Sequence, residues 1–164
     1  MLKNLFKKST GELKIYAPLE GKVVDLNEVP DPVFAERMMG EGVAIEPVNG
    51  EVVSPVDGEI VQLFHTNHAV GIKTKSGVEV LVHIGLETVS MEGEGFEGHV
   101  KAGDKVKTGD KLITFDMNLV KEKAKSTITP IIITNYNDVA ANMEQHTMDN
   151  AIRGETEIIM IQLK

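Results

Sequence analysis

The chain has 164 residues, the length of one domain with a single hydrophobic core and too short for two full domains. Lys and Arg total 17 against 25 Asp and Glu, a formal charge of −8, which repels phosphate backbones and argues against nucleic acid as a main partner. The lack of cysteine excludes a disulfide scaffold, thiolate zinc and a Cys nucleophile. The longest apolar stretches, such as 78–84 and 128–133, are much shorter than the roughly 20 residues of a membrane-spanning helix, so we expect a soluble protein.

Residues 1–14 are expected to form a flexible tail ahead of a single domain at 15–164. The tail lacks the continuous apolar region and cleavage site of a signal peptide, and we expect a cytoplasmic protein. Leu2, Leu5 and Phe6 fall on one helical face with lysines opposite, an arrangement that also suits a negatively charged membrane surface. Because so short a helix is marginal in water, a solvated tail is the favoured interpretation.

From Ile15 onward, short β-branched runs alternate with glycine, proline, Asp-Gly and Asn-Gly turns, which predicts an all-β fold. Their regular spacing favours an antiparallel β-sandwich or barrel with only short peripheral helices. The predicted strands are 15–17, 21–25, 42–47, 51–54, 58–63, 69–74, 78–83, 111–116, 131–134 and 156–163, and the predicted helices are 32–39 and 118–126.

An internal sequence repeat indicates that the barrel is built from two similar halves, as in the duplicated hybrid type. Ala17-Pro18-x-x-Gly21 recurs as Ser54-Pro55-x-x-Gly58, each followed by a β-branched run. The proline fixes φ for a turn, and the glycine supplies a conformation that other residues resist. Both copies are therefore expected to turn directly into a strand.

Residues 65–85 predict a β-hairpin with its tip at Lys75-Ser76-Gly77. A two-residue loop places His68 either opposite His83 or diagonal to it, depending on where the loop starts. Only a three-residue loop would separate the two imidazoles, so we expect them to lie together.

Alternation along the second strand of the hairpin separates its two faces. Val78, Val80, Val82 and Ile84 form an all-aliphatic face, which should be the core. His83 then lies on the outward face with Leu81, and we expect Val70 and Ile72 beside it in an exposed apolar patch, which is typical of a protein docking site. The first strand fits less well, since this parity points Lys73 inward.

Two neutral imidazoles on an apolar surface suit metal binding, general acid–base catalysis or nucleophilic attack by a ring nitrogen on phosphorus. Thr66, two residues before His68, could supply a hydroxyl to the same site. The residues alone leave open whether the pair is functional or structural. His65, His99 and His146 are expected to be surface residues.

The chain resembles the glucose-family enzyme IIA of the bacterial phosphoenolpyruvate-dependent sugar phosphotransferase system, over nearly all of 15–164. The motifs that carry the resemblance are Ala17-Pro18-x-x-Gly21, Val29-Pro30-Asp31-Pro32-Val33-Phe34-Ala35-Glu36, Gly40-Glu41-Gly42-Val43-Ala44-Ile45, Ser54-Pro55-Val56-Asp57-Gly58, Thr66-Asn67-His68-Ala69, Leu81-Val82-His83-Ile84-Gly85-Leu86-Glu87-Thr88-Val89 and Gly103-Asp104 through Asp116. The order and number of these motifs make the resemblance specific.

This resemblance implies a phosphocarrier whose acceptor is His83. Its Nε2 would take a phosphoryl group from the phosphohistidine of HPr and pass it to the cysteine of a glucose-type IIB domain. It implies that His68 stabilises the phosphoryl group, that Thr66 tunes that hydrogen-bond network, and that the Gly85 carbonyl orients the acceptor ring. There is no P-loop or Mg²⁺ motif, and no cofactor is expected to be required.

The resemblance also implies an apolar docking rim ringed by acids that pair with basic residues of HPr or IIB and steer their encounter. The rim residues are Val33, Phe34, Met38, Met39, Phe64, Val70 and Leu81, and the acids are Asp31 and Glu87. Regulatory target proteins are further expected partners, although neither they nor the sugar can be read from these residues.

Two other functions compete with the phosphocarrier interpretation. A lipoyl- or biotinyl-type carrier would need Lys123 as its modified lysine, but Glu122-Lys123-Ala124 follows the Gly-Asp-Lys turns instead of preceding them. A zinc hydrolase, or a regulatory zinc site completed at a partner interface, would use His68 and His83 as ligands. A catalytic zinc site wants three protein ligands, and no third ligand is evident in the sequence.

Overall fold

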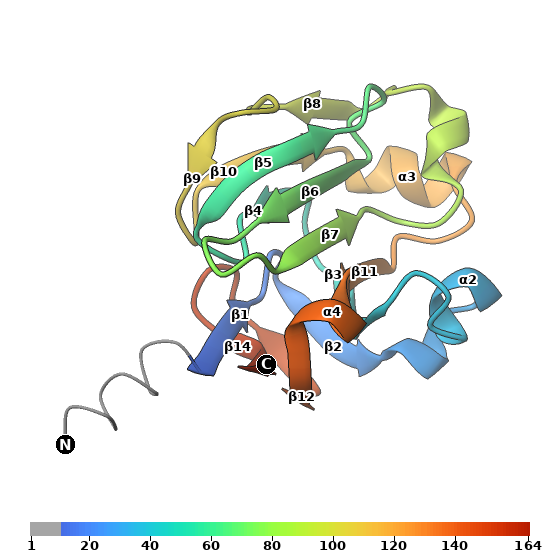
Figure 1. Ribbon diagram of the computed structural model, residues 1–164. Coiled ribbons are helices and arrows are strands. Elements are labelled where there is room, and N and C mark those ends of the chain that lie inside the picture. Colours follow the sequence, from blue (N-terminus) through green and yellow to red (C-terminus); the bar gives the residue numbers. More distant parts are fainter. Residues whose placement is uncertain (1–10) are drawn as a thin grey trace, which may run out of the picture.

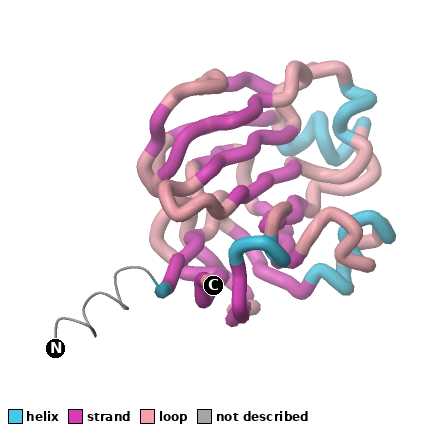
Figure 2. The backbone as a smooth tube through the Cα atoms, viewed as in Figure 1, coloured by secondary structure: helices cyan, strands magenta, loops and turns pink. Residues whose placement is uncertain are grey.

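The computed structural model describes residues 11–164, and its regular structure is mostly antiparallel strand with a few short helices at the periphery (Figures 1 and 2). The predicted all-β class is therefore confirmed. Within these residues, no helix is long and apolar enough to cross a membrane. The strands are β1 (Glu12–Tyr16), β2 (Gly21–Asp25), β3 (Glu41–Pro47), β4 (Glu51–Val53), β5 (Gly58–Leu63), β6 (Ala69–Lys73), β7 (Glu79–His83), β8 (Phe96–Gly98), β9 (Lys105–Val106), β10 (Lys111–Phe115), β11 (Thr129–Ile133), β12 (Ala140–Gln145), β13 (Met148–Ala151) and β14 (Glu157–Leu163). The helices are η1 (Leu26–Glu28), α2 (Pro32–Ala35), η2 (Thr88–Met91), α3 (Met117–Lys123) and α4 (Tyr136–Val139).

The strands of residues 11–164 form three sheets. The largest has the order β13-β2-β3-β11-β7-β6-β5-β9, and the two smaller sheets are β1-β14-β12 and β4-β10-β8. Sequence neighbours pair as hairpins in β2–β3, β5–β6 and β6–β7, whereas β11 inserts between β3 and β7. The large sheet thus brings segments distant in the sequence to the strand that carries His83.

The predicted boundary between tail and domain is wrong by several residues. β1 begins at Glu12, which pairs with Gln162 at the C-terminal strand, so residues 12–14 belong to the domain. The run Glu-Leu-Lys has little β character of its own, and the ladder to β14 supplies the hydrogen bonds that make it a strand. Residues 1–10, including the proposed membrane-facing face of Leu2, Leu5 and Phe6, lie outside the described residues.

Four strands, β8, β9, β12 and β13, were not predicted. They are short or polar, and β12 and β13 lack a β-branched pattern, so pairing with β14 and β2 decides their conformation. The two predicted helices are present but shorter, as α2 and α3.

The repeated Pro-x-x-Gly motifs lie side by side and exchange hydrogen bonds. The Tyr16 N–H donates to the Pro55 carbonyl and the Val53 N–H to the Pro18 carbonyl, both at 2.9 Å. Gly21 begins β2, where a Cβ would lie 2.1 Å from the Glu46 carbonyl oxygen. The reciprocal bonds support the prediction of two similar halves.

Buried apolar side chains form two clusters on opposite faces of the large sheet. Ile131 and Val82 belong to the main core, whereas the next residue on β11, Ile132, joins a second cluster with Leu81 and Phe34. Strands β7 and β11 are therefore covered on both faces, as period-two alternation requires when each face has a packing partner.

We predict that Ile131→Ala lowers the free energy of unfolding by about 3 kcal/mol. The substitution leaves a cavity in the core, and the surrounding side chains fill this cavity only in part. Ile131 is fully buried between β3 and β7. Urea denaturation measures the effect, with Val48→Ala, 68% exposed, as the control. A loss no larger than that of the control would contradict this packing.

Candidate functional site

The hairpin of β6 and β7 has a three-residue loop, contrary to the predicted two-residue loop. Ala69 pairs with His83 and Val70 with Val82. The loop closes through the Thr74 N–H, which donates to the Val78 carbonyl, and Gly77 has φ of 91°. A left-handed glycine at the end of a three-residue hairpin loop accounts for this register.

His68 and His83 nevertheless lie together, so the expectation that a three-residue loop would separate them is wrong. Their ring centroids are 5.1 Å apart, with an interplanar angle of 81°. His68 precedes β6 and follows a turn in which Asn67 has φ of 59°, so strand alternation does not set its direction. Its carbonyl still accepts from the Ile84 N–H at 2.7 Å, which holds the two histidine segments side by side.

The same register corrects the predicted position of Val70. Opposite Val82, it faces the main core and is fully buried, as is Ile72 opposite Val80. Lys73 is consequently exposed, which removes the conflict in the predicted parity. Val70 is thus a core residue and does not belong to an exposed rim.

The Gly85 carbonyl fixes the tautomer of His83. His83 Nδ1 lies 2.9 Å from the Gly85 oxygen, and because a carbonyl can only accept, Nδ1 carries the proton and Nε2 keeps its lone pair. Burial lowers the pKa of His83, opposed by this hydrogen bond and by the negative charge of Asp31. The ring is therefore held in the neutral, nucleophilic form near pH 7.

The loop after β7 aims that carbonyl at the ring. Gly85 has φ of 71°, and its N–H lies 3.4 Å from the Thr129 hydroxyl oxygen. The Leu86 N–H donates to the Ser126 carbonyl at 2.9 Å. This support could not be predicted from the sequence, because residues 126–129 are about forty positions away from Gly85 and carry no local signal of the contact.

His68 is more deeply buried, with 4% of its surface exposed. Its Nδ1 is hydrogen-bonded to the Thr66 hydroxyl, so Thr66 supplies a hydroxyl to this site as predicted. Burial, together with the electrostatic effect of His83, lowers the pKa of His68 to about 4. Phe64 packs edge-on against the ring, with centroids 5.4 Å apart.

The residues predicted to form a docking rim divide into two groups. Val33, Met38 and Met39 are exposed, at 38%, 71% and 36%, and Glu87 is exposed, while Phe64 and Asp31 are half-buried. Phe34 and Leu81 are only 4% and 7% exposed, which corrects their assignment as surface residues. Phe34 instead packs on His83, with ring centroids 5.1 Å apart.

The other candidate residues lie elsewhere. His65 and His99 are exposed and His146 faces Glu157, in keeping with the surface positions predicted for them. Lys123 lies in α3, and its ammonium donates to Glu94 at 2.7 Å.

Among residues 11–164, no three His, Cys, Asp or Glu side chains are grouped so as to hold a metal ion. Both Nδ1 atoms of the histidine pair have hydrogen-bond partners, so zinc would bind the two Nε2 atoms, with His68 in the tautomer whose Nδ1–H donates to Thr66. A tetrahedral site would still lack ligands. Zinc shared by His68 and His83 with a partner's side chain therefore stays a prediction.

The described residues thus form an all-β domain in which two histidines lie together and His83 keeps a free lone pair on Nε2. Residues 13–139 match the family model of the phosphoenolpyruvate-dependent sugar phosphotransferase system, EIIA 1. The chain belongs to this family.

Similar proteins place the chain in the glucose branch of the family. It is 60% identical to a glucose-specific EIIA component of Bacillus anthracis over the whole of both chains. It is 48% identical to one of Staphylococcus aureus over 99% of each. The solved structure of glucose permease IIA from Mycoplasma capricolum matches with a TM-score of 0.83 and 42% identity, over 91% of this chain and 95% of the other.

We predict that Gly85→Ala disturbs the tautomer of His83. A Cβ at this residue would lie 2.7 Å from Thr88 Cγ2 and 2.8 Å from the Ser126 carbonyl oxygen, at a φ that favours glycine. The loop must shift, and the carbonyl moves with it. Nitrogen-15 NMR should then show a mixture of tautomers at His83, whereas Gly103→Ala, with open space for its Cβ, is a control for a positive-φ glycine. A single unchanged tautomer in Gly85→Ala would contradict the prediction.

The pKa of His68 predicts a loss of stability in acid. Well above pH 6.5 the folded and unfolded chains both hold this ring neutral, so it contributes no pH dependence there. As the pH falls from 6.5 to 4, the unfolded chain binds the proton first, which lowers the free energy of unfolding by about 3 kcal/mol. Urea denaturation between pH 7 and 4 should show a shallower loss in His68→Gln than in the wild type. Equal slopes would place the pKa of His68 near its ordinary value.

Proposed function

We propose that this chain is a cytoplasmic phosphocarrier that accepts a phosphoryl group on His83 from phosphorylated HPr and donates it to the cysteine of a glucose-type IIB domain. The single observation that carries the proposal is the hydrogen bond from His83 Nδ1 to the Gly85 carbonyl. It leaves Nε2 unprotonated beside a second neutral histidine. Family membership supplies the class of reaction.

The proposed transfer balances without a cofactor. The lone pair of His83 Nε2 attacks phosphorus, the P–N bond of the donor phosphohistidine breaks, and its electron pair returns to the donor nitrogen. In the second transfer a cysteine thiolate attacks phosphorus, and the Nε2–P electrons return to His83. Such transition states are loose, so alignment and charge stabilisation supply most of the catalysis.

His68 is proposed to stabilise the charge on the transferred group. When the Thr66 hydroxyl donates to Nδ1, the proton of the neutral His68 ring lies on Nε2, where it can donate to a phosphoryl oxygen. Because the ring is buried and its pKa is about 4, it acts as a fixed neutral donor. A dipole fixed in a water-poor site costs little reorganisation during the reaction.

The exposed face beside the pair is proposed to receive HPr and the IIB domain. Val33 supplies exposed apolar surface next to Phe34, and Glu87 supplies negative charge. Met38 and Met39 are exposed too, but they line a separate hollow with Thr134 and Tyr136, near the start of β7. The acidic charge is expected to steer basic partners.

We predict that the wild type gains one phosphoryl group from phosphorylated HPr and that His83→Ala gains none. His68→Ala should react about 100 times more slowly, the cost of losing one aligned hydrogen-bond donor in a transition state. Intact mass and phosphorus-31 NMR identify the product, and His99→Ala, exposed and remote, is the matched control. An unreactive wild type, with HPr shown to be competent on another IIA protein, would overturn the proposal.

A further inference from the structure

The segment between β2 and β3, residues 26–40, packs beside His83 and forms one wall of its surroundings. It contains η1 and α2 and buries Leu26, Val29 and Phe34 against the outer face of the large sheet. Phe34 packs on the His83 ring, and the charge of Asp31 acts on the same ring. The position of this wall therefore sets the surroundings of the acceptor.

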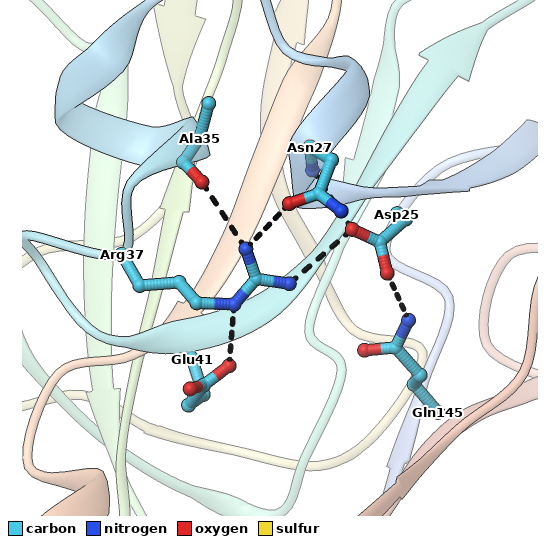
Figure 3. Close-up of polar contacts among 6 residues, drawn as sticks. All are labelled: Asp25, Asn27, Ala35, Arg37, Glu41 and Gln145. Carbon is cyan, nitrogen blue, oxygen red and sulfur yellow. Dashed lines mark hydrogen bonds and ion pairs between the residues drawn. The ribbon is translucent and has the colours of Figure 1, made fainter.

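One side chain, that of Arg37, fastens this segment at both ends. Figure 3 shows its guanidinium between Asp25, which precedes the segment, and Glu41, which follows it, and it shows Gln145 bonded to Asp25. Nε donates to Glu41 at 2.9 Å, Nη1 to Asn27 at 2.8 Å and to the Ala35 carbonyl at 3.1 Å, Nη2 to Asp25 at 3.2 Å, and Gln145 Nε2 donates to Asp25 at 2.7 Å. Asp25 ends β2 and Glu41 begins β3, so Arg37 joins the two strand ends from which the wall projects.

The backbone of Arg37 adopts a conformation that would suit glycine better. Its φ is 58°, just after the end of α2, and its N–H donates to the Phe34 carbonyl while the Met38 N–H donates to that of Val33. This pair of bonds is the usual left-handed ending of a helix, which favours glycine. An arginine there is strained, and the contacts of its side chain offset that strain.

We propose that Arg37 is a positioning residue for phosphoryl transfer, which holds Phe34 and Asp31 against His83 by clamping the two ends of the β2–β3 segment. The inference rests on the proposed function. Arg37 acts through Phe34 and Asp31, since its own donors are directed to Asp25, Asn27, Ala35 and Glu41.

Loss of the Arg37 hydrogen bonds is expected to change the pKa of His83. The titratable groups that act on this ring are His68 and Asp31. Burial is the larger influence on its pKa, so a displaced wall should let water reach the ring. The pKa of His83 then rises towards its ordinary value.

Arg37→Gly is the main test because it removes the side chain while relieving the backbone strain, so folding is retained. Arg37→Lys keeps the charge but loses the planar group of donors that reaches Asp25, Asn27 and Glu41 together. The matched control is Arg153→Lys, since Arg153 is equally exposed at 29% and also pairs with two carboxylates, Glu20 and Glu51. Arg153 lies outside the β2–β3 segment and takes no part in the hydrogen bonds that Arg37 makes.

The expected result is that Arg37→Gly lowers kcat with phosphorylated HPr about tenfold, less than the roughly 100-fold cost of a 1 Å misplacement. Arg37→Lys should be intermediate, and Arg153→Lys should match the wild type. Nitrogen-15 NMR titration should show a raised His83 pKa in Arg37→Gly, a smaller rise in Arg37→Lys and no change in Arg153→Lys.

Wild-type kcat and an unchanged His83 titration in Arg37→Gly would overturn the inference. So would a lowered melting temperature with an unchanged titration, which would mean a purely structural role. The titration needs no phosphoryl donor, so it tests the clamp even where the wild type accepts no phosphoryl group, an outcome that would overturn the proposed function instead.

Discussion

Burial of β7 on both faces is the constraint on which the site depends. Val80 and Val82 pack into the main core, and Leu81 packs into the second cluster under η1 and α2. His83 ends this strand, so its backbone is held as rigidly as a core residue while its ring is only half-buried. In the proposed transfer, such a strand fixes the backbone of the acceptor, which is one part of the preorganisation that an in-line reaction requires.

The two histidines are kept neutral by different surroundings. His68 is enclosed by Phe64 and the Thr66 turn, and burial alone dominates its pKa. At His83, burial is partly opposed by the Gly85 carbonyl and by Asp31. Both rings are thus held neutral near pH 7, although hydrogen bonding and a carboxylate oppose the effect of burial at His83 only.

The alternation of Val78, Val80, Val82 and Ile84 was enough to predict which face of β7 is core, and this was confirmed. The same reasoning failed for β6, because a three-residue loop shifts the register by one and sends Val70 inward. The loop length depends on Gly77 adopting a left-handed conformation. Lys73 could have indicated the correct register, since only this register leaves its ammonium in water.

By itself, the sequence determined the all-β class, most strands and the family, because alternation, turn residues and motifs are local or ordered along the chain. The register and the turn that bring His68 beside His83 are features of the tertiary structure. The tertiary structure alone decided that Phe34 and Leu81 are buried, that Thr129 and Ser126 support the Gly85 turn and that Arg37 joins Asp25 to Glu41. These contacts depend on packing between segments far apart in the sequence or on side-chain direction after a turn. Local pattern carries no information on either, since both follow from the way the sheets close around the core.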